Sequence, residues 1–161
     1  MTDQTHSLLA QLHAETQAFS QFFNTLQAEQ QALVGNDVNA LTALSQTKQK
    51  QVETLNHLAE ERMRQLAALG LHSDETGMEQ WLAAAGNPGQ KAWQELLAIA
   101  REAYHCNQVN GTLIQKNMQH HQKALSVLMT AANQVSLYGA DGQPQGIYPG
   151  SGASRGIIGK A

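Results

Sequence analysis

The sequence has few of the residues that mark disulfide-bonded, membrane-spanning or nucleic-acid-binding proteins. Cys106 is its one cysteine, which rules out an internal disulfide and favours a reducing compartment. No apolar run approaches the roughly 20 residues that span a bilayer, and the start, MTDQTHSLL, lacks the pattern of a signal peptide. The net charge is −3, with no basic cluster. We therefore expect a cytoplasmic chain with no stable membrane insertion and no nucleic-acid partner.

Aromatic residues and prolines are also scarce, which favours an all-helical fold. Phe, Trp and Tyr make up 5% of the 161 residues, whereas alanine, leucine and glutamine are abundant. The three prolines lie at positions 88, 144 and 149, so no proline interrupts a helix in the first half of the chain. We predict an all-α fold: an elongated antiparallel bundle of three long helices with a short connector helix and a tail rich in glycine and proline.

Apolar residues that recur every seven positions predict the first long helix, over about residues 5–34. Its stripe is formed by Leu12, Phe19, Leu26 and Leu33, which lie on one side of an amphipathic helix.

The second long helix is predicted over about residues 38–69. Asp37 directly precedes it and is a preferred N-cap residue, and Gly70 directly follows it as a C-terminal stop. Lys48 and Arg62 fall in the seven-residue column of its leucines. We expect their stems to cover apolar surface while their charges stay in water.

The third long helix is predicted over about residues 90–136, after a short helix at about 75–85 and the breaker Gly86-Asn87-Pro88-Gly89. Its apolar positions fill four neighbouring columns, twice the width of a coiled-coil seam. A face this wide packs against two helices, or against one helix and a partner. At about 1.5 Å per residue, this helix exceeds the other two by roughly 20 Å. Part of its apolar face therefore needs another cover.

The C-terminal segment, residues 138–161, differs from the rest, because it contains seven glycines and two prolines. We predict a helical domain at residues 1–137 and a flexible interaction tail at 138–161. A pure spacer would not need the tail's large apolar residues, which are Ile147, Tyr148, Ile157 and Ile158.

Asn107, Asn110 and Gly111 interrupt the apolar face of the third helix, one turn apart. In one interpretation they form a polar notch that fixes helix register, with the glycine admitting a bulky side chain from a facing helix. In the other they belong to a binding groove, where the asparagines bond a partner's backbone and the glycine lets it approach.

The third helix carries the run Asn107-x-x-Asn110-Gly111-x-Leu113-Ile114, followed by Leu125 and Leu128. This run resembles the signature of the FlgN family of flagellar export chaperones. Further matches are Asp37-x-x-x-Leu41-x-x-Leu44-x-x-x-Lys48, Arg62 and the tail opening Tyr138-Gly139-x-x-Gly142. Order, spacing and length agree over nearly the whole chain, apart from the connector around Trp81 and the last dozen residues.

The resemblance implies a cytosolic type III secretion chaperone for the hook–filament junction proteins FlgK and FlgL. Such chaperones hold a disordered C-terminal segment of the client, prevent premature assembly and deliver the client to the flagellar export apparatus. The physics of a wide apolar helix face suits this role, because an amphipathic client helix can lie in such a groove.

We place client binding on the distal part of the third helix and expect a monomer or weak homodimer. The predicted contacts are Asn110, Gly111, Ile114, Met118, His121, Leu125 and Leu128. Ile147 and Tyr148 in the tail would close over the client or replace it in the empty site. Tyr138 is either the last anchor of the third helix or a docking residue for the export gate.

Other functions have weaker support in the sequence. Glu53, His57 and Glu61 are spaced to face one metal ion, but no fourth ligand is indicated, and we predict no metal site. No nucleophile elbow, phosphate loop or paired carboxylates appear, so we expect no catalytic residues, no cofactor and no enzyme activity. The main alternative is a structural coiled-coil module that self-associates, or an adapter, without client specificity.

Overall fold

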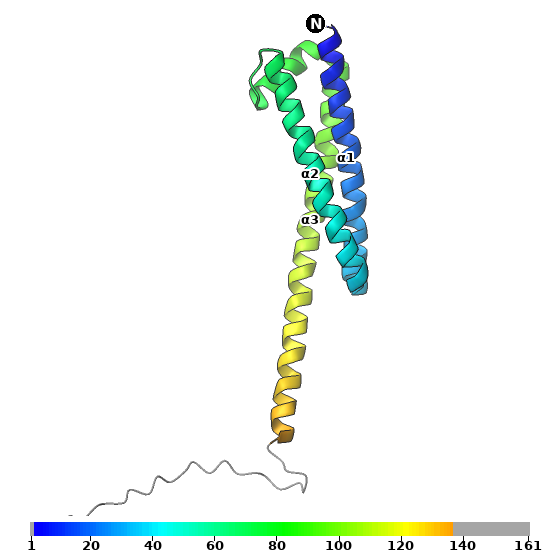
Figure 1. Cartoon of the computed structure of the whole chain (residues 1–161), viewed down its shortest axis with the longest axis vertical. Coiled ribbons are helices and arrows are strands. Elements are labelled where there is room, and N and C mark those ends of the chain that lie inside the picture. The colour runs from blue at the N-terminus through cyan, green and yellow to red at the C-terminus, as the bar shows by residue number, and fades with distance from the viewer. Residues whose placement is uncertain (1, 137–161) are drawn as a thin grey trace, which may run out of the picture. The chain divides into compact units, whose positions relative to one another are not determined.

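The computed structural model describes the backbone of residues 2–136 and the side chains of residues 6–131. It contains three helices, which are α1 (Thr2–Gly35), α2 (Val38–Ala68) and α3 (Glu75–Ser136) (Figure 1). No strand occurs among the described residues. The prediction of an all-helical chain with three long helices is confirmed for this part of the sequence. The predicted tail, with Tyr138, Ile147 and Tyr148, lies outside the described residues.

The predicted helix breaker is present inside α3. Gly86 has φ 68° and ψ −155°, a backbone conformation that interrupts the helix and that only glycine adopts without strain. Residues 75–85 therefore form a short helix of their own, as predicted, and the long part of α3 follows the break. Trp81 on the short helix is buried in the core.

The turn between α1 and α2 has the predicted cap. The side chain of Asp37 accepts a hydrogen bond from the backbone N–H of Ala40 at 3.0 Å, which satisfies one of the free donors at the start of α2. Asn36, directly before it, has φ 53° and turns the chain. At the other end of α2, Gly70 has φ 74°, the left-handed conformation of a helix stop.

Residues from all three helices form the core. One cluster of buried residues consists of Leu8, Leu12, Leu66, Met78, Trp81, Ala92 and Leu96. A second consists of Leu26, Ala103 and Cys106, with Phe19, Phe22 and Phe23 packed against it. The predicted stripe of α1 thus faces inward, and Cys106 is the buried small residue that its position in the stripe of α3 predicts.

Two ion pairs fix the direction and register of α1 and α2. Glu15 pairs with Arg62, and Glu29 pairs with Lys48, both at 3.0 Å. Glu29, which is nearer the C-terminal end of α1, thus pairs with Lys48, which is nearer the N-terminal end of α2. The two glutamates are as far apart in the sequence as the two cations. The two helices therefore run in opposite directions, as Figure 1 shows.

Two asparagines fix the register of α3 against α1. Asn110 donates to the backbone carbonyl of Leu26 at 2.8 Å, and Asn117 donates to that of Leu33 at 3.1 Å. In each of these pairs, the asparagine and its acceptor residue are 84 positions apart in the sequence. Because the separation is constant, α1 and this part of α3 run in the same direction.

The chain divides into two compact units, residues 1–118 and residues 119–161. The first contains α1, α2 and α3 as far as Met118. The described part of the second is the helical stretch 119–136. The predicted boundary between residues 137 and 138 adjoins residues outside the described ones and stays a prediction.

Candidate functional site: the exposed face of α3

A buried polar layer joins one residue from each helix in the first unit. The Lys48 ammonium donates to both carboxylate oxygens of Glu29, at 3.0 and 3.2 Å. The amide nitrogen of Asn110 donates to Glu29 Oε2 at 2.7 Å, as well as to the carbonyl of Leu26. The side chain of Asn110 is 0% exposed, and its Oδ1 has no hydrogen-bond partner among the described residues. This layer holds α1, α2 and α3 in one register.

A second layer, nearer the start of α1, is built in the same way. Arg62 Nε donates to both carboxylate oxygens of Glu15, at 3.0 and 3.2 Å. The Arg62 guanidinium carbon also lies 5.2 Å from the centre of the Trp93 ring on α3, a cation–π distance. Burial raises the pKa of Glu15 above its usual value, although Arg62 acts in the opposite direction.

The prediction that the charges of Lys48 and Arg62 stay in water is wrong. Both cations point at carboxylates of α1, and the side chains of Glu15 and Arg62 are only 3% and 16% exposed. The physical reason is that a charge in an apolar column needs a partner where the helices meet. The sequence does contain a signal for these ion pairs, because Glu15 and Glu29 lie in the same seven-residue column as Leu8 and Phe22 on α1.

The structure separates the residues of the asparagine–glycine patch. Asn110 lies in the core with its N–H donors bonded to α1, so it is the register residue and is not available to a client. Asn107 and Gly111 are exposed. A Cβ at Gly111 would meet nothing within 4 Å, so no side chain of the described residues fills the space that the glycine leaves. The interpretation as a polar notch thus fits Asn110, whereas no facing helix among the described residues fills the space at Gly111.

Five exposed residues of α3 in the first unit follow a coiled-coil spacing. They alternate by three and four positions and form two adjoining seven-residue columns on one face. Tyr104, Ile114 and Met118 are exposed large hydrophobic residues. We call this face the α3 seam; its members in the first unit are Tyr104, Asn107, Gly111, Ile114 and Met118.

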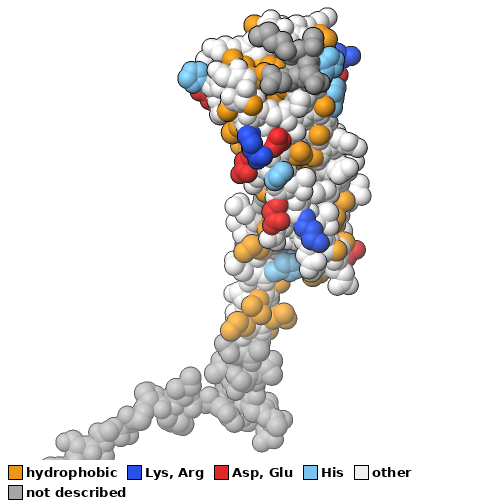
Figure 2. Space-filling model, turned by 45° about the horizontal axis from the view of Figure 1, so that its top comes forward, with side chains coloured by type: hydrophobic (Ala, Val, Ile, Leu, Met, Phe, Trp, Pro, Cys, Tyr) orange, Lys and Arg blue, Asp and Glu red, His pale blue; other side chains and the backbone are white. Residues whose placement is uncertain are grey.

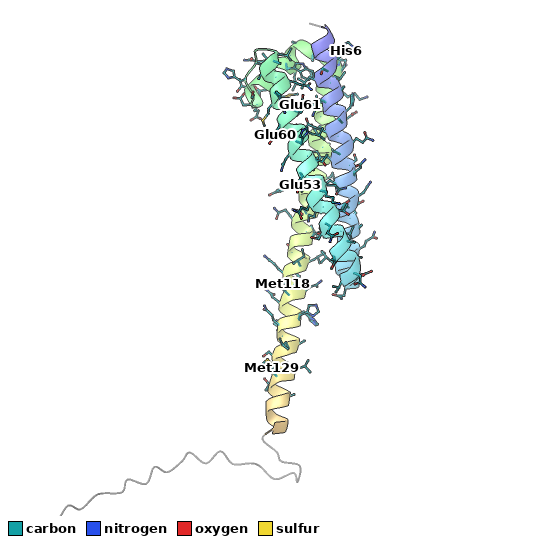
Figure 3. All side chains as sticks on the ribbon, in the orientation of Figure 1. His6, Glu53, Glu60, Glu61, Met118 and Met129 are labelled. Atoms are coloured by element: carbon teal, nitrogen blue, oxygen red, sulfur yellow. The ribbon has the colours of Figure 1, made fainter. Side chains whose placement is uncertain are left out.

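The same seven-residue spacing recurs in the sequence of the helical stretch of the second unit with His121, Leu125 and Leu128, which are all exposed. On the ground of this spacing alone, the name α3 seam is used for them too. Val127 and Met129 are also exposed, and sequence reasoning did not select them. Figure 2 shows hydrophobic side chains gathered at the lower end of the coloured surface, and Figure 3 labels Met118 and Met129 on α3. Of the predicted contacts that fall within the described residues, all but Asn110 are thus exposed.

Other possible sites have less support. No group of three or more His, Cys, Asp or Glu side chains within the described part is placed to hold a metal ion. Glu61, labelled on α2 in Figure 3, pairs with Arg64 at 2.8 Å. Burial, together with the nearby charge of Glu29, raises the pKa of the Cys106 thiol, which disfavours the reactive thiolate. None of the described helices is long and apolar enough to cross a membrane.

Comparison with known proteins assigns the family. The family model described as FlgN protein matches residues 1–146. A relative in Proteus mirabilis, "Flagella synthesis protein FlgN", is 30% identical over 122 residues, which cover 74% of this chain and 77% of the relative. A protein of the same name in Yersinia enterocolitica is 43% identical over 54 residues, and the chain spans 36% of that relative's length. No solved structure matches the chain. The resemblance seen in the asparagine–glycine run of the third helix is therefore confirmed, and the chain belongs to the FlgN family.

Proposed function

We propose that this chain is a cytoplasmic chaperone of flagellum assembly, which binds the hook–filament junction proteins FlgK and FlgL through the α3 seam. It holds the C-terminal segment of the client as an amphipathic helix, prevents premature assembly and delivers the client to the export apparatus. Tyr138 in the tail is kept as the proposed docking residue for that apparatus, and the proposed chaperone is not an enzyme. Family membership supports the flagellar role, and the seam supports the mode of binding.

The observation that carries the proposal is the exposure of large apolar residues at coiled-coil spacing. Met118, Leu125 and Leu128 are 56%, 59% and 66% exposed. Single exposed leucines are common on protein surfaces, but a row of them on one helix face indicates a binding surface. The spacing is that of the surface which an amphipathic partner helix covers.

Gly111 has a role in this proposal. It is the central one of the five seam residues in the first unit, and the space where its Cβ would stand is open. A partner helix can therefore approach α3 closely at this position or place a large side chain there. This explains why a glycine, which costs about 1 kcal/mol relative to alanine inside a helix, stands at an exposed helical position.

Calorimetry with purified FlgK and FlgL tests the proposal, using the full chain and two variants. Leu125→Glu places a charge in the seam, while Ser126→Glu places the same charge on a neighbouring face that the client does not cover. Burying one leucine contributes roughly 1.5–3 kcal/mol, so we expect Leu125→Glu to weaken binding by about tenfold or more. Ser126→Glu should bind as the natural chain does. Absence of binding by the natural chain, or equal binding by both variants, contradicts the proposal.

The structural alternative predicts a different result from the same samples. If the seam serves self-association, light scattering shows a stable homodimer that ignores FlgK and FlgL and dissociates on Leu125→Glu. We expect a monomer or weak dimer that forms a larger complex only when a junction protein is added.

A further inference from the structure

We infer that the client covers residues 119–131 with two helices that carry acidic side chains, one on the α3 seam and one on a second face. This rests on the proposed function and adds the form and charge of the client. The second face consists of Ala124, Val127 and Ala131, which are all exposed. We call it the continuation face.

Within the first unit, α1 contacts α3 close to its own C-terminal end, because Asn117 pairs with Leu33 and α1 ends shortly afterwards at Gly35. α2 starts at Val38, directly after the turn, and runs back along α1.

The columns of the continuation face are the ones that pack inward in the first unit. Val127 lies in the column of Cys106 and Leu113, and Ala124 and Ala131 lie in the column of Asn110 and Asn117. Cys106 and Asn110 are buried, whereas Val127 is 67% exposed. The sequence thus keeps the pattern of an inward-facing column at positions that the described part of the chain leaves exposed.

The combined width of the two faces sets the number of client helices. A coiled-coil seam has two columns and takes one helix. The seam and the continuation face together have four adjoining columns. A helix face of that width is covered by two neighbours, as it is in the core of a helix bundle.

The charge of α3 indicates what the client helices carry. From Ala103 to Ser136 there is no Asp or Glu, and the two charged residues are Lys116 and Lys123. Lys123 precedes Val127 by four positions, so it borders the continuation face. Acidic side chains at the edge of a client helix would meet these lysines.

The same charges argue against two alternative covers of the continuation face, namely a second copy of the chain and the tail at 138–161. A second copy would bring the same lysine-bearing helix against this one, without a carboxylate to pair with. The tail at 138–161 carries one acid, Asp141, against Arg155 and Lys160, and its glycine and proline content is unsuited to a covering helix. An external acidic helical pair is the better complement.

The test measures binding of FlgK and FlgL to the full chain by calorimetry, with substitutions at three consecutive positions. Leu128→Glu probes the seam, Val127→Glu probes the continuation face, and Ser126→Glu is the control for added charge. We expect the first two to weaken binding by about tenfold or more and the control to stay within about twofold. Lys123→Glu should weaken binding and reduce its salt dependence. Because these residues are exposed, circular dichroism should show unchanged helicity, and Val127→Ser repeats the test without a charge.

The outcomes separate this inference from the proposed function. If Leu128→Glu weakens binding while Val127→Glu and Val127→Ser do not, the client uses one helix, and the inference is overturned although the chaperone role stands. If Lys123→Glu binds more tightly, the acidic character is overturned. A homodimer that Val127→Glu dissociates, or tighter client binding after removal of residues 138–161, would assign the continuation face to a second copy or to the tail. If the natural chain binds neither junction protein, the proposed function itself fails.

Discussion

Arg62→Met is the most informative single change in the core, because it leaves the Glu15 carboxylate buried without its cation. The Glu15 side chain is 3% exposed, and both of its oxygens accept from Arg62 Nε. Removing one partner of a buried ion pair typically costs about 3–5 kcal/mol, since the remaining charge stays desolvated. Methionine has a similar length and keeps most of the packing against Trp93. We expect the free energy of unfolding at about pH 7.5 to fall by about 3–5 kcal/mol.

The loss should depend on pH, with a sign set by Glu15. Burial raises the pKa of Glu15 in the folded chain, so the folded state binds the proton more tightly than the unfolded state does. The contribution of Glu15 to stability is therefore fully present below its usual pKa and is lost as the pH rises through the raised value. Without Arg62 that pKa rises further. The deficit of Arg62→Met should thus shrink on acidification, by at most about 1.4 kcal/mol per pH unit.

Urea unfolding followed by circular dichroism at about pH 7.5 and about pH 5 measures both effects. Glu15→Gln combined with Arg62→Met is the control, because it removes the buried charge, and it should recover much of the lost stability. A deficit of Arg62→Met below about 1 kcal/mol, or one that is equal at both pH values, would refute the assignment of Glu15 and Arg62 as a buried, coupled pair.

Three other substitutions test separate parts of the structure. Asn110→Ala removes two buried hydrogen bonds, one of them to a carboxylate, and should lower the free energy of unfolding by about 2–4 kcal/mol in urea titrations; a loss below about 1 kcal/mol would contradict the register role. Gly111→Leu adds a side chain in open space and should raise that free energy by up to about 1 kcal/mol while changing the calorimetric affinity for FlgK; lower stability would mean that the position is covered. Gly77→Ala would place a Cβ against the backbone carbonyl of His72 and should lower the thermal midpoint, at a cost of about 1–3 kcal/mol; an unchanged midpoint would show that this turn relaxes freely.

The helices themselves could be predicted from the sequence, because their signals are local. Asp37 and Gly70 act through their own backbone neighbours, and the Gly86 break needs no distant contact to form. The observed bounds of α1 and α2 lie within one helical turn of the predicted ones. Seven-residue periodicity also identified the broad face of α3.

Which columns of the broad face of α3 are buried and which are exposed could not be predicted in the same way. Which columns of α3 pack inward depends on where α1 and α2 lie, and this is set by contacts across 81 to 84 residues of sequence. Asn110 and Gly111 are adjacent in the sequence and look equally suited to a binding groove. Once Asn110 turns toward Leu26, the step of about 100° per residue along the helix directs Gly111 to the outside.

The two asparagines also hold the part of α3 in the first unit against a slip along α1. A shift of α3 by one heptad, about 10 Å, would draw more of its apolar residues alongside α1. Asn117 would then take the place of Asn110 and find the same partners. Asn110, however, would move to the place of Ala103, in the cluster of Leu26 and the phenylalanines that pack against it, and away from the Glu29 carboxylate. A buried polar group that loses a hydrogen-bond partner costs about 1–3 kcal/mol, and Ala124 would bring no donor to the carbonyl of Leu33. One asparagine would permit the slip, but two at this spacing oppose it.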